Sequence, residues 1–298
     1  MKPVDLASLV LLAALWGGSY MFIRVAAPAF GPAPLMFGRV VIAGVLLWAV
    51  LRGLRKPIAL RGLGGRIMVI GLLNAALPFT LVAAAELHIT ASLASVLTAT
   101  VPLFGTILAV YWLDERLTAN RVVGVVTGFA GVAIVAGWSS VDFTTPAALS
   151  IAAVLVGSLS YAASGIYAKR TLAGIPSSTL ALGQQAGAAA WLAIPAMLWL
   201  PSSPPSPEAV GSLLALAVLA TSLAFVLYYR LIARIGPTLT QTVTYLIPLF
   251  GIAWGALFLN ERITPGMLIG CGLIIGSIAL VGGVRLRIPS AAKVVASR

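Results

Sequence analysis

The sequence predicts an all-α integral membrane protein with ten transmembrane helices, arranged as two inverted five-helix repeats. Three observations support this prediction: an apolar composition, an uneven distribution of charge between alternate loops, and an internal duplication. Of 298 residues, 60% are hydrophobic and only 9% are charged, whereas a typical soluble domain has about 25% charged residues. Ten helices of about 20 residues, the length that crosses a bilayer core, leave room only for short connections, so a sizeable aqueous domain is excluded.

Each predicted helix is an apolar run that ends at a turn signal. The first run continues to Ala27, which is too long for the core of a signal peptide, so we interpret it as a retained helix. The clearest breaks between later helices are the Gly-Pro segment 31–34, the basic segment 52–66, the charged turn 114–116 and the proline-rich segment 201–207. In chain order, helices are predicted at residues 4–27, 33–51, 64–86, 90–112, 119–137, 146–168, 177–199, 208–230, 237–259 and 265–284.

The basic residues are concentrated in every second loop. If the N-terminus is cytoplasmic, 16 of the 19 Lys and Arg residues fall on the cytoplasmic side (19 − 3), as is typical of membrane proteins. The three exceptions are Arg262 in an outside loop and Arg24 and Arg39 near the outer ends of their helices. The net charge of +12 is therefore explained by topology, and no nucleic-acid partner is required.

The second half of the sequence repeats motifs of the first. VPLFG at 101–105 recurs as IPLFG at 247–251, an offset of 146 residues (248 − 102). At the same offset, LDERLT at 113–118 matches LNERIT at 259–264. With an offset of 145, Trp16 pairs with Tyr161, Ser19 with Ser164 and Arg39 with Gln184. These matches indicate a duplication that covers most of the chain.

Because each half holds five helices, an odd number, the second half must enter the membrane from the opposite side. We therefore predict a first repeat at 1–139, an inverted second repeat at 146–285 and a cytoplasmic tail at 286–298. Inverted repeats that exchange conformations open a central cavity alternately to the two sides of the membrane. Such a body is typical of a small-molecule transporter.

The same motifs resemble the duplicated domain of the drug/metabolite transporter superfamily. PLFG followed by LDERLT, and again by LNERIT, carries the resemblance, together with LWGGS at 15–19 and FGR at 37–39. Within that superfamily, the sequence is most similar to the EamA-type ten-helix exporters of amino acids and metabolites. The resemblance implies cytoplasmic N- and C-termini, a cavity between the halves, and export of metabolites such as amino acids across a bacterial inner membrane.

Polar and aromatic side chains within the apolar helices predict where that cavity lies. Such side chains are costly toward lipid and usually face the protein interior, although for each of them packing is an alternative role. Together they predict a neutral, aromatic-lined cavity that suits ligands with little net charge. The candidate substrate-binding residues are Trp16, Tyr20, Arg39, Asn74, Phe79, Thr98, Tyr161, Gln184, Tyr228, Thr244 and Tyr245.

Arg39 has two interpretations. Near the outer end of its helix, its long side chain can reach the lipid headgroups or form an ion pair with Glu86. Alternatively, it extends into the outer vestibule and binds a carboxylate, such as that of an amino acid.

Pro102 and Pro248 are predicted to lie in the middle of equivalent helices. A proline there removes a backbone hydrogen bond and kinks the helix, so the pair is a candidate for gating elements. The alternative is that each proline only shapes the helix bundle.

Ion coupling is not expected from the positions of the acidic residues. Asp and Glu are absent from the middle of every predicted helix, whereas proton-coupled carriers usually need a buried titratable group. We therefore expect facilitated export. The alternatives are a proton-coupled multidrug exporter and a flippase for lipid-linked substrates.

Other classes of protein lack the residues that they need. The sequence has no phosphate-binding GxxxxGK[ST] motif, and its single histidine, His88, and single cysteine, Cys271, cannot assemble a catalytic triad or a cysteine metal site. We therefore expect neither an enzyme nor a cofactor or metal. The expected partners are a small-molecule substrate and the lipid bilayer, and the expected state is a monomer.

Overall fold

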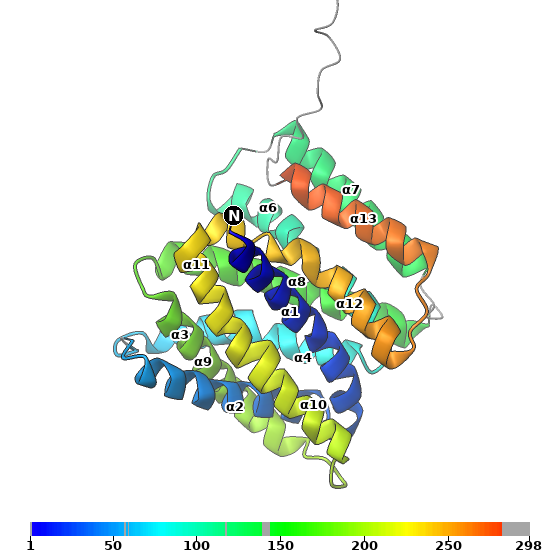
Figure 1. The fold of residues 1–298 in the computed structure, drawn as a ribbon. Coiled ribbons are helices and arrows are strands. Elements are labelled where there is room, and N and C mark those ends of the chain that lie inside the picture. Colours follow the sequence, from blue (N-terminus) through cyan, green and yellow to red (C-terminus); the bar gives the residue numbers. More distant parts are fainter. Residues whose placement is uncertain (1, 57, 59, 117, 139–143, 282–298) are drawn as a thin grey trace, which may run out of the picture.

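The computed structural model describes residues 2–281, except residues 57, 59, 117 and 139–143. Within the described residues, all regular secondary structure is helical, and no β-strand is present. Figure 1 shows the helices packed as one bundle. The predicted tail at 286–298, the end of the second predicted repeat at 282–285, and Leu117 of the LDERLT motif lie outside the described residues.

The first half of the chain forms five spans, two of which are interrupted. The third span contains a π-helix, and the fourth is divided at Ala99 and Thr100. Thr90 begins the fourth span as an N-cap, because its hydroxyl accepts a hydrogen bond from the Leu93 amide at 3.2 Å. In chain order, the elements are α1 (Pro3–Phe30), α2 (Pro32–Gly53), α3 (Gly64–Gly71), η1 (Leu72–Ala76), α4 (Leu77–Ala85), α5 (Ala91–Thr98), α6 (Val101–Trp112) and α7 (Ala119–Gly137).

The second half has the same general pattern. Ser and Thr hydroxyls again cap helices, with Thr144 before α8 and Ser206 before α10. The backbone leaves helical geometry at Gly236, which has a φ of 81° that is accessible to glycine without strain. The elements are α8 (Thr145–Thr171), α9 (Ser177–Leu198), α10 (Pro207–Ala217), η2 (Val218–Leu223), α11 (Ala224–Thr240), α12 (Val243–Leu259) and α13 (Pro265–Val281).

The predicted fold class is confirmed. By length and composition, seven helical stretches in the described part of the chain can cross a membrane, and α12 and α13 are shorter apolar helices. The 22-residue helix α9 follows the prediction for the seventh span. Each of the ten predicted spans is therefore helical over most of its length.

Two features of the spans differ from the sequence prediction. The π-helices η1 and η2 were not predicted, and they begin 146 residues apart (218 − 72), which is the offset of the sequence repeat. Pro102 does not lie mid-helix but in the first turn of α6, directly after the break at Ala99 and Thr100, whereas Pro248 lies inside α12. The first turn tolerates proline because the amide that proline lacks would have no partner there.

The two halves interlock. Helix α1 packs against α10, α11 and α12 of the second half, while α8 packs against α4, α5 and α6 of the first half. Helices α2 and α9 also pack against each other across the halves. The interface between the halves is therefore built from helices of both.

Glycine permits the closest helix contacts, as is typical of membrane bundles, where van der Waals packing replaces a hydrophobic driving force. Helices α7 and α13 lie side by side at one edge of the bundle (Figure 1). A Cβ added to Gly131 of α7 would lie 2.9 Å from the carbonyl oxygen of Gly270 of α13. These glycines therefore form a contact within the chain, whereas Gly272 and Gly276 have no neighbour within 4 Å of an added Cβ.

Because successive spans alternate in direction, the bundle has two ends. We call the end at which α1 begins the entry end; there Asp5 forms an ion pair with Arg234 (2.7 Å). We call the opposite end the closed end, where Glu261 accepts a hydrogen bond from the Ala91 amide at 2.8 Å.

Candidate substrate cavity

A cavity of about 640 Å³ lies between the two halves of the bundle. All eleven predicted substrate-binding residues line it, and so do Pro102 and Pro248. Their roles as substrate ligands or gating elements stay predictions. Gly165 and Gln241 on the wall are exposed at the surface, whereas Ile23 and Val82 on the wall are buried. The cavity therefore opens toward the entry end and is shut toward the closed end.

Arg39 is the only charged residue among the described residues that line this cavity. Its side chain is on α2, and the residue is only 5% exposed. Its Nε donates a hydrogen bond to Thr221 Oγ1 at 3.0 Å, and its guanidinium carbon lies 3.7 Å from the centroid of the Phe79 ring. Within the described residues, no ion pair is formed by Arg39.

The structure therefore corrects one interpretation of Arg39. An arginine that reached the lipid headgroups would be exposed, and an arginine paired with Glu86 would form an ion pair; Arg39 does neither. Thr221 belongs to the π-helix η2, and its hydroxyl also donates to the Leu216 carbonyl oxygen at 2.9 Å. The π-helix thus holds the acceptor that orients the guanidinium toward the cavity.

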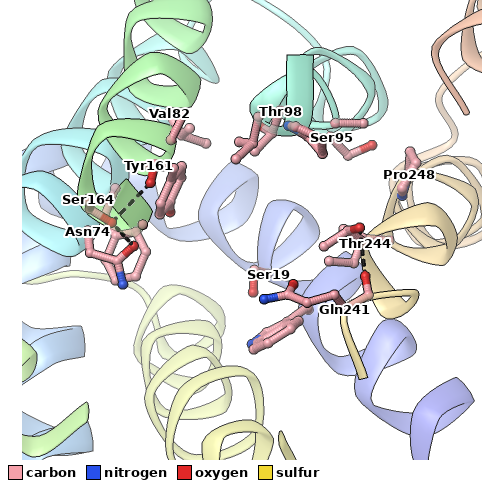
Figure 2. A pocket seen from close by; sticks show the side chains of 18 of the residues that line it. Ser19, Asn74, Val82, Ser95, Thr98, Tyr161, Ser164, Gln241, Thr244 and Pro248 are labelled. Carbon is pink, nitrogen blue, oxygen red and sulfur yellow. Dashed lines mark hydrogen bonds between the residues drawn. The ribbon is translucent and has the colours of Figure 1, made fainter. Parts of the chain in front are cut away.

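A cluster of neutral polar side chains lies on another part of the wall. Asn74, from the π-helix η1, donates from Nδ2 to Gln184 Oε1 at 2.5 Å, and Ser164 Oγ donates to Asn74 Oδ1 at 2.7 Å. Figure 2 shows Asn74, Ser164 and Tyr161 close together, across the cavity from Gln241 and Thr244. We call Asn74, Ser164 and Gln184 the amide cluster.

Aromatic rings form much of the remaining wall. The Trp16 ring lies 5.4 Å from Tyr228 and 6.3 Å from Phe225 between centroids, and the Phe79 ring lies 6.2 Å from Tyr161. The predicted aromatic lining is therefore present. Phe225 was not among the candidate residues, although the repeat offset of 146 from Phe79 could have identified it.

Two contacts recur in both halves of the site. Arg39 reaches η2 through Thr221, and its repeat partner Gln184 reaches η1 through Asn74. Likewise, Phe79 contacts Tyr161 while its repeat partner Phe225 contacts Trp16, the partner of Tyr161. We call these two similar halves of the cavity wall the half-sites. They have the same arrangement of contacts but differ in charge, because one carries the Arg39 guanidinium and the other carries only amides and a hydroxyl.

Close packing of α5 on α12 shuts the cavity toward the closed end. A Cβ added to Gly251 of α12 would overlap Ser95 of α5, and one added to Gly255 would overlap Ser92. Glu261 accepts from the Ser92 amide at 2.9 Å and from its hydroxyl. By contrast, Gly105, the repeat partner of Gly251, has no neighbour within 4 Å of an added Cβ and lines the open cavity.

Comparison with known protein families identifies two similar segments in this chain. The model of the EamA-like transporter family matches residues 6–137 and again residues 148–283. The chain is 28% identical over 279 residues to the uncharacterized transporter YvbV of Bacillus subtilis, covering 92% of this chain and 90% of that protein. It is 28% identical over 285 residues to the uncharacterized inner membrane transporter YedA of Escherichia coli K12, covering 92% and 89%.

One relative has a name that specifies a cargo. The chain is 29% identical over 286 residues to a probable terminal-alkyne amino-acid exporter of Streptantibioticus cattleyicolor, covering 92% of each protein. Among solved structures, one described only as the crystal structure of a protein superimposes with a TM-score of 0.68 at 18% identity, covering 94% of this chain and 96% of that one. This likeness supports the fold alone.

Proposed function

The chain belongs to the EamA-like transporter family, and from this premise we propose that it exports amino acids or related small carboxylates across a bacterial inner membrane. It is a multi-pass membrane transporter that acts on small molecules, and it is not an enzyme. The substrate class, the direction and the mechanism are the proposal.

The observation that carries the proposal is the buried, unpaired guanidinium of Arg39 on the cavity wall. A buried charge is costly unless an opposite charge or several hydrogen bonds compensate it. Of the five N–H donors, Nε bonds Thr221 and one on Nη1 makes a weak contact with the Met36 sulfur at 4.0 Å, while the Phe79 ring covers one face of the guanidinium. A substrate carboxylate would accept hydrogen bonds from the remaining donors, so this site favours anionic groups over cationic drugs.

The rest of the cavity suits the other parts of an amino acid. The amide cluster offers oxygen acceptors to an ammonium group, and the Trp16 and Tyr228 rings offer apolar faces to a side chain. A cavity of about 640 Å³ has ample room for such a ligand. The relative from Streptantibioticus, whose name specifies an amino-acid exporter, supports the same substrate class.

Alternating access between inverted repeats is the proposed mechanism. The two matched family segments, the two π-helices and the paired contacts of the half-sites all support a duplicated architecture. Gly251 is packed at the closed end, while its repeat partner Gly105 faces open space. If the halves exchange these conformations, Gly105 becomes packed and the cavity opens to the other side.

Transport is proposed to be facilitated. Among the described residues on the cavity wall, none is a carboxylate that would exchange protons with the cavity. A concentration gradient of substrate would therefore drive export. The alternatives, a proton-coupled multidrug exporter and a lipid-linked substrate flippase, are disfavoured by the guanidinium and by the polar amide cluster.

Counterflow in proteoliposomes tests the proposal, with the purified protein and a panel of labelled amino acids. Arg39→Gln is expected to raise the KM of the transported amino acid by roughly 10- to 100-fold, because a hydrogen bond to a charged group contributes about 1.5–3 kcal/mol. Arg39→Lys should raise the KM less, since lysine keeps the positive charge although it lacks the planar guanidinium. Arg262→Gln, at an exposed position outside the cavity, is the matched control. Unchanged counterflow in Arg39→Gln at normal expression would refute the role of Arg39.

A further inference from the structure

A second buried ionisable group lies outside the cavity wall. Glu86 follows the third span, Gly64–Ala85, at the closed end of the bundle. Glu86 is 0% exposed, and neither of its carboxyl oxygens has a hydrogen-bond partner among the described residues. Glu86 lies at the end of a span and not in its middle, and its burial depends on the packing of neighbouring helices, which the sequence alone does not reveal.

The neighbours of Glu86 do not neutralise it by contact. Arg24 of α1 donates a hydrogen bond to the backbone carbonyl of Glu86, not to its carboxyl group. The carboxylate of Glu261, from the connection between α12 and α13, accepts three hydrogen bonds from Ala91 and Ser92, whereas the carboxyl group of Glu86 accepts none from the described residues. Two further titratable groups, Tyr20 on α1 and Arg39 on α2, interact electrostatically with Glu86, and His88 lies in the same loop.

Both solvation and charge favour the neutral form of this carboxyl. Burial, followed by the nearby charge of Glu261, raises the pKa of Glu86 well above its usual range, and the opposing effects of Arg24 and Arg39 are smaller. A buried carboxylate without donors would be strongly destabilising, whereas a protonated carboxyl of the same shape is tolerated. The burial of Glu86 and its lack of donors in the closed end therefore favour a proton on its carboxyl group.

We propose that Glu86 is a proton-binding site of the closed end, and that a proton from the solvent at that end binds to its carboxylate when the end closes and leaves when it opens. The step forms one O–H bond on the carboxylate and breaks it on opening, with no electron transfer. This inference rests on the alternating access of the proposed function. It adds a ligand, the proton, that sets which side of the membrane the cavity faces.

The proton is not carried across the membrane in this scheme. Glu86 does not line the cavity, so when the closed end is shut its proton has no route to the entry end. Export therefore remains facilitated with respect to its driving force. Its rate nevertheless depends on the pH at the closed end, because that pH controls how readily the end reopens.

The direction of the effect follows from proton binding. In this scheme the closed conformation binds the proton more tightly than the open one. Proton binding therefore stabilises the closed conformation fully when the pH is below the pKa that Glu86 has in the open conformation. This stabilisation is lost as the pH rises through the higher pKa that Glu86 has in the closed conformation. Between these two values, the ratio of closed to open molecules falls by about tenfold for each pH unit of increase.

The experiment measures the distance across the closed end. In a Cys271→Ser background of the full chain, spin labels are attached to cysteines that replace Leu87 and Ile263, both exposed and on opposite sides of the closure. Double electron–electron resonance is recorded at a series of pH values that runs from acidic to alkaline. The short-distance population should grow as the pH falls.

Substitution assigns the response to one carboxyl. Glu86→Gln mimics the protonated group, so its short-distance population should dominate at every pH. Glu208→Gln removes an exposed carboxylate from the first turn of α10 and should leave the pH response intact. Infrared spectroscopy of the unsubstituted protein should show the C=O stretch of a protonated carboxyl at neutral pH, a readout that needs no variant.

Two outcomes overturn the proposal: a distance distribution that does not depend on pH, or a pH response that survives in Glu86→Gln. Either result, together with Arg39-dependent counterflow, would reject the proton site and leave the proposed function standing. An intact pH response without counterflow of any amino acid would do the reverse. The two proposals can therefore fail separately.

Discussion

At the scale of single residues, the surroundings of two charged side chains determine what each of them can do. The sequence predicts Arg39 and Glu86 near the outer ends of their helices, where charged groups usually reach the headgroups. In the structure, both are buried, at 5% and 0% exposure. The Arg39 guanidinium contacts the Thr221 hydroxyl and the Phe79 ring, whereas the carboxyl group of Glu86 accepts no hydrogen bond from the described residues. Their roles therefore differ although their positions in sequence look alike.

Thr221 is predicted to act as a positioning residue for Arg39. In Thr221→Val, the side chain keeps its shape but the acceptor for Arg39 Nε is lost, so the guanidinium is no longer aimed at the cavity. We expect a roughly 10-fold higher KM for the transported amino acid, about the value of one hydrogen bond to a charged group, with little change in kcat. Counterflow kinetics at several substrate concentrations measure this split.

The neighbouring substitution Ser222→Ala is the control, because Ser222 bonds backbone carbonyl oxygens and does not line the cavity. Equal effects of the two substitutions on KM would indicate general damage to η2 and would contradict a positioning role for Thr221.

At the scale of elements, the packing of α5 on α12 shuts one end of the cavity, and it does so through glycine. The repeat places glycine at 105 and 251, and the two positions look equivalent in sequence. In the structure they are not, since an added Cβ would overlap Ser95 at position 251 and would meet nothing within 4 Å at position 105.

Gly251→Ala and Gly105→Ala are therefore expected to act in opposite directions. Gly251→Ala should separate α5 from α12 and reduce the short-distance population between labels at positions 87 and 263. Gly105→Ala should leave that population unchanged or increase it, because by repeat equivalence it obstructs packing only in the opposite conformation. Double electron–electron resonance on both variants measures the difference in their short-distance populations.

Transport activity is the companion measurement for these glycine variants, since obstruction of either conformation slows the cycle. Both substitutions should lower counterflow, although they populate different conformations. Identical distance distributions in the two variants would reject the equivalence on which the exchange model depends.

The interruptions in the helices contribute side chains to the cavity. Each π-helix supplies a polar side chain to a half-site, Asn74 from η1 and Thr221 from η2. An extra residue in a helical turn changes the direction in which later side chains point and frees backbone carbonyls. Pro102 begins α6 after a break, while Pro248 lies within α12, so the paired prolines occupy different local structures in this conformation.

At the scale of the whole molecule, the direction of the cavity depends on orientation in the membrane. The cavity opens toward the end at which α1 begins, and the charge distribution predicts that this end is cytoplasmic. We therefore expect that the conformation described here faces inward.

Labelling of single cysteines in a Cys271→Ser background tests this orientation. Leu54 and Leu200 are exposed and follow α2 and α9, at opposite ends of the bundle. A membrane-impermeant maleimide should label Leu200→Cys in intact cells and Leu54→Cys only after permeabilisation, because the basic loops remain inside. The reverse pattern would make the same conformation outward-facing.

Much of this architecture could be predicted because its signals are local or repeated. Apolar runs and turn residues located the ten spans, and all eleven candidate substrate-binding residues lie on one cavity wall. Polar and aromatic side chains are costly toward lipid, so their presence in apolar helices was enough to find the cavity. The π-helices were not predicted, since no periodicity in the sequence marks an inserted residue.

The sequence by itself determined the membrane class, the ten spans, the duplication and the residues of the cavity, because composition and periodicity depend on each segment and its solvent. Only the tertiary structure decided which end is shut, that Arg39 is unpaired on the cavity wall, and that Glu86 is buried without a partner. These properties depend on which segments meet. Gly105 and Gly251 carry the same sequence signal, yet one lines a cavity and the other seals it, because a single chain adopts one packing of its two similar halves at a time.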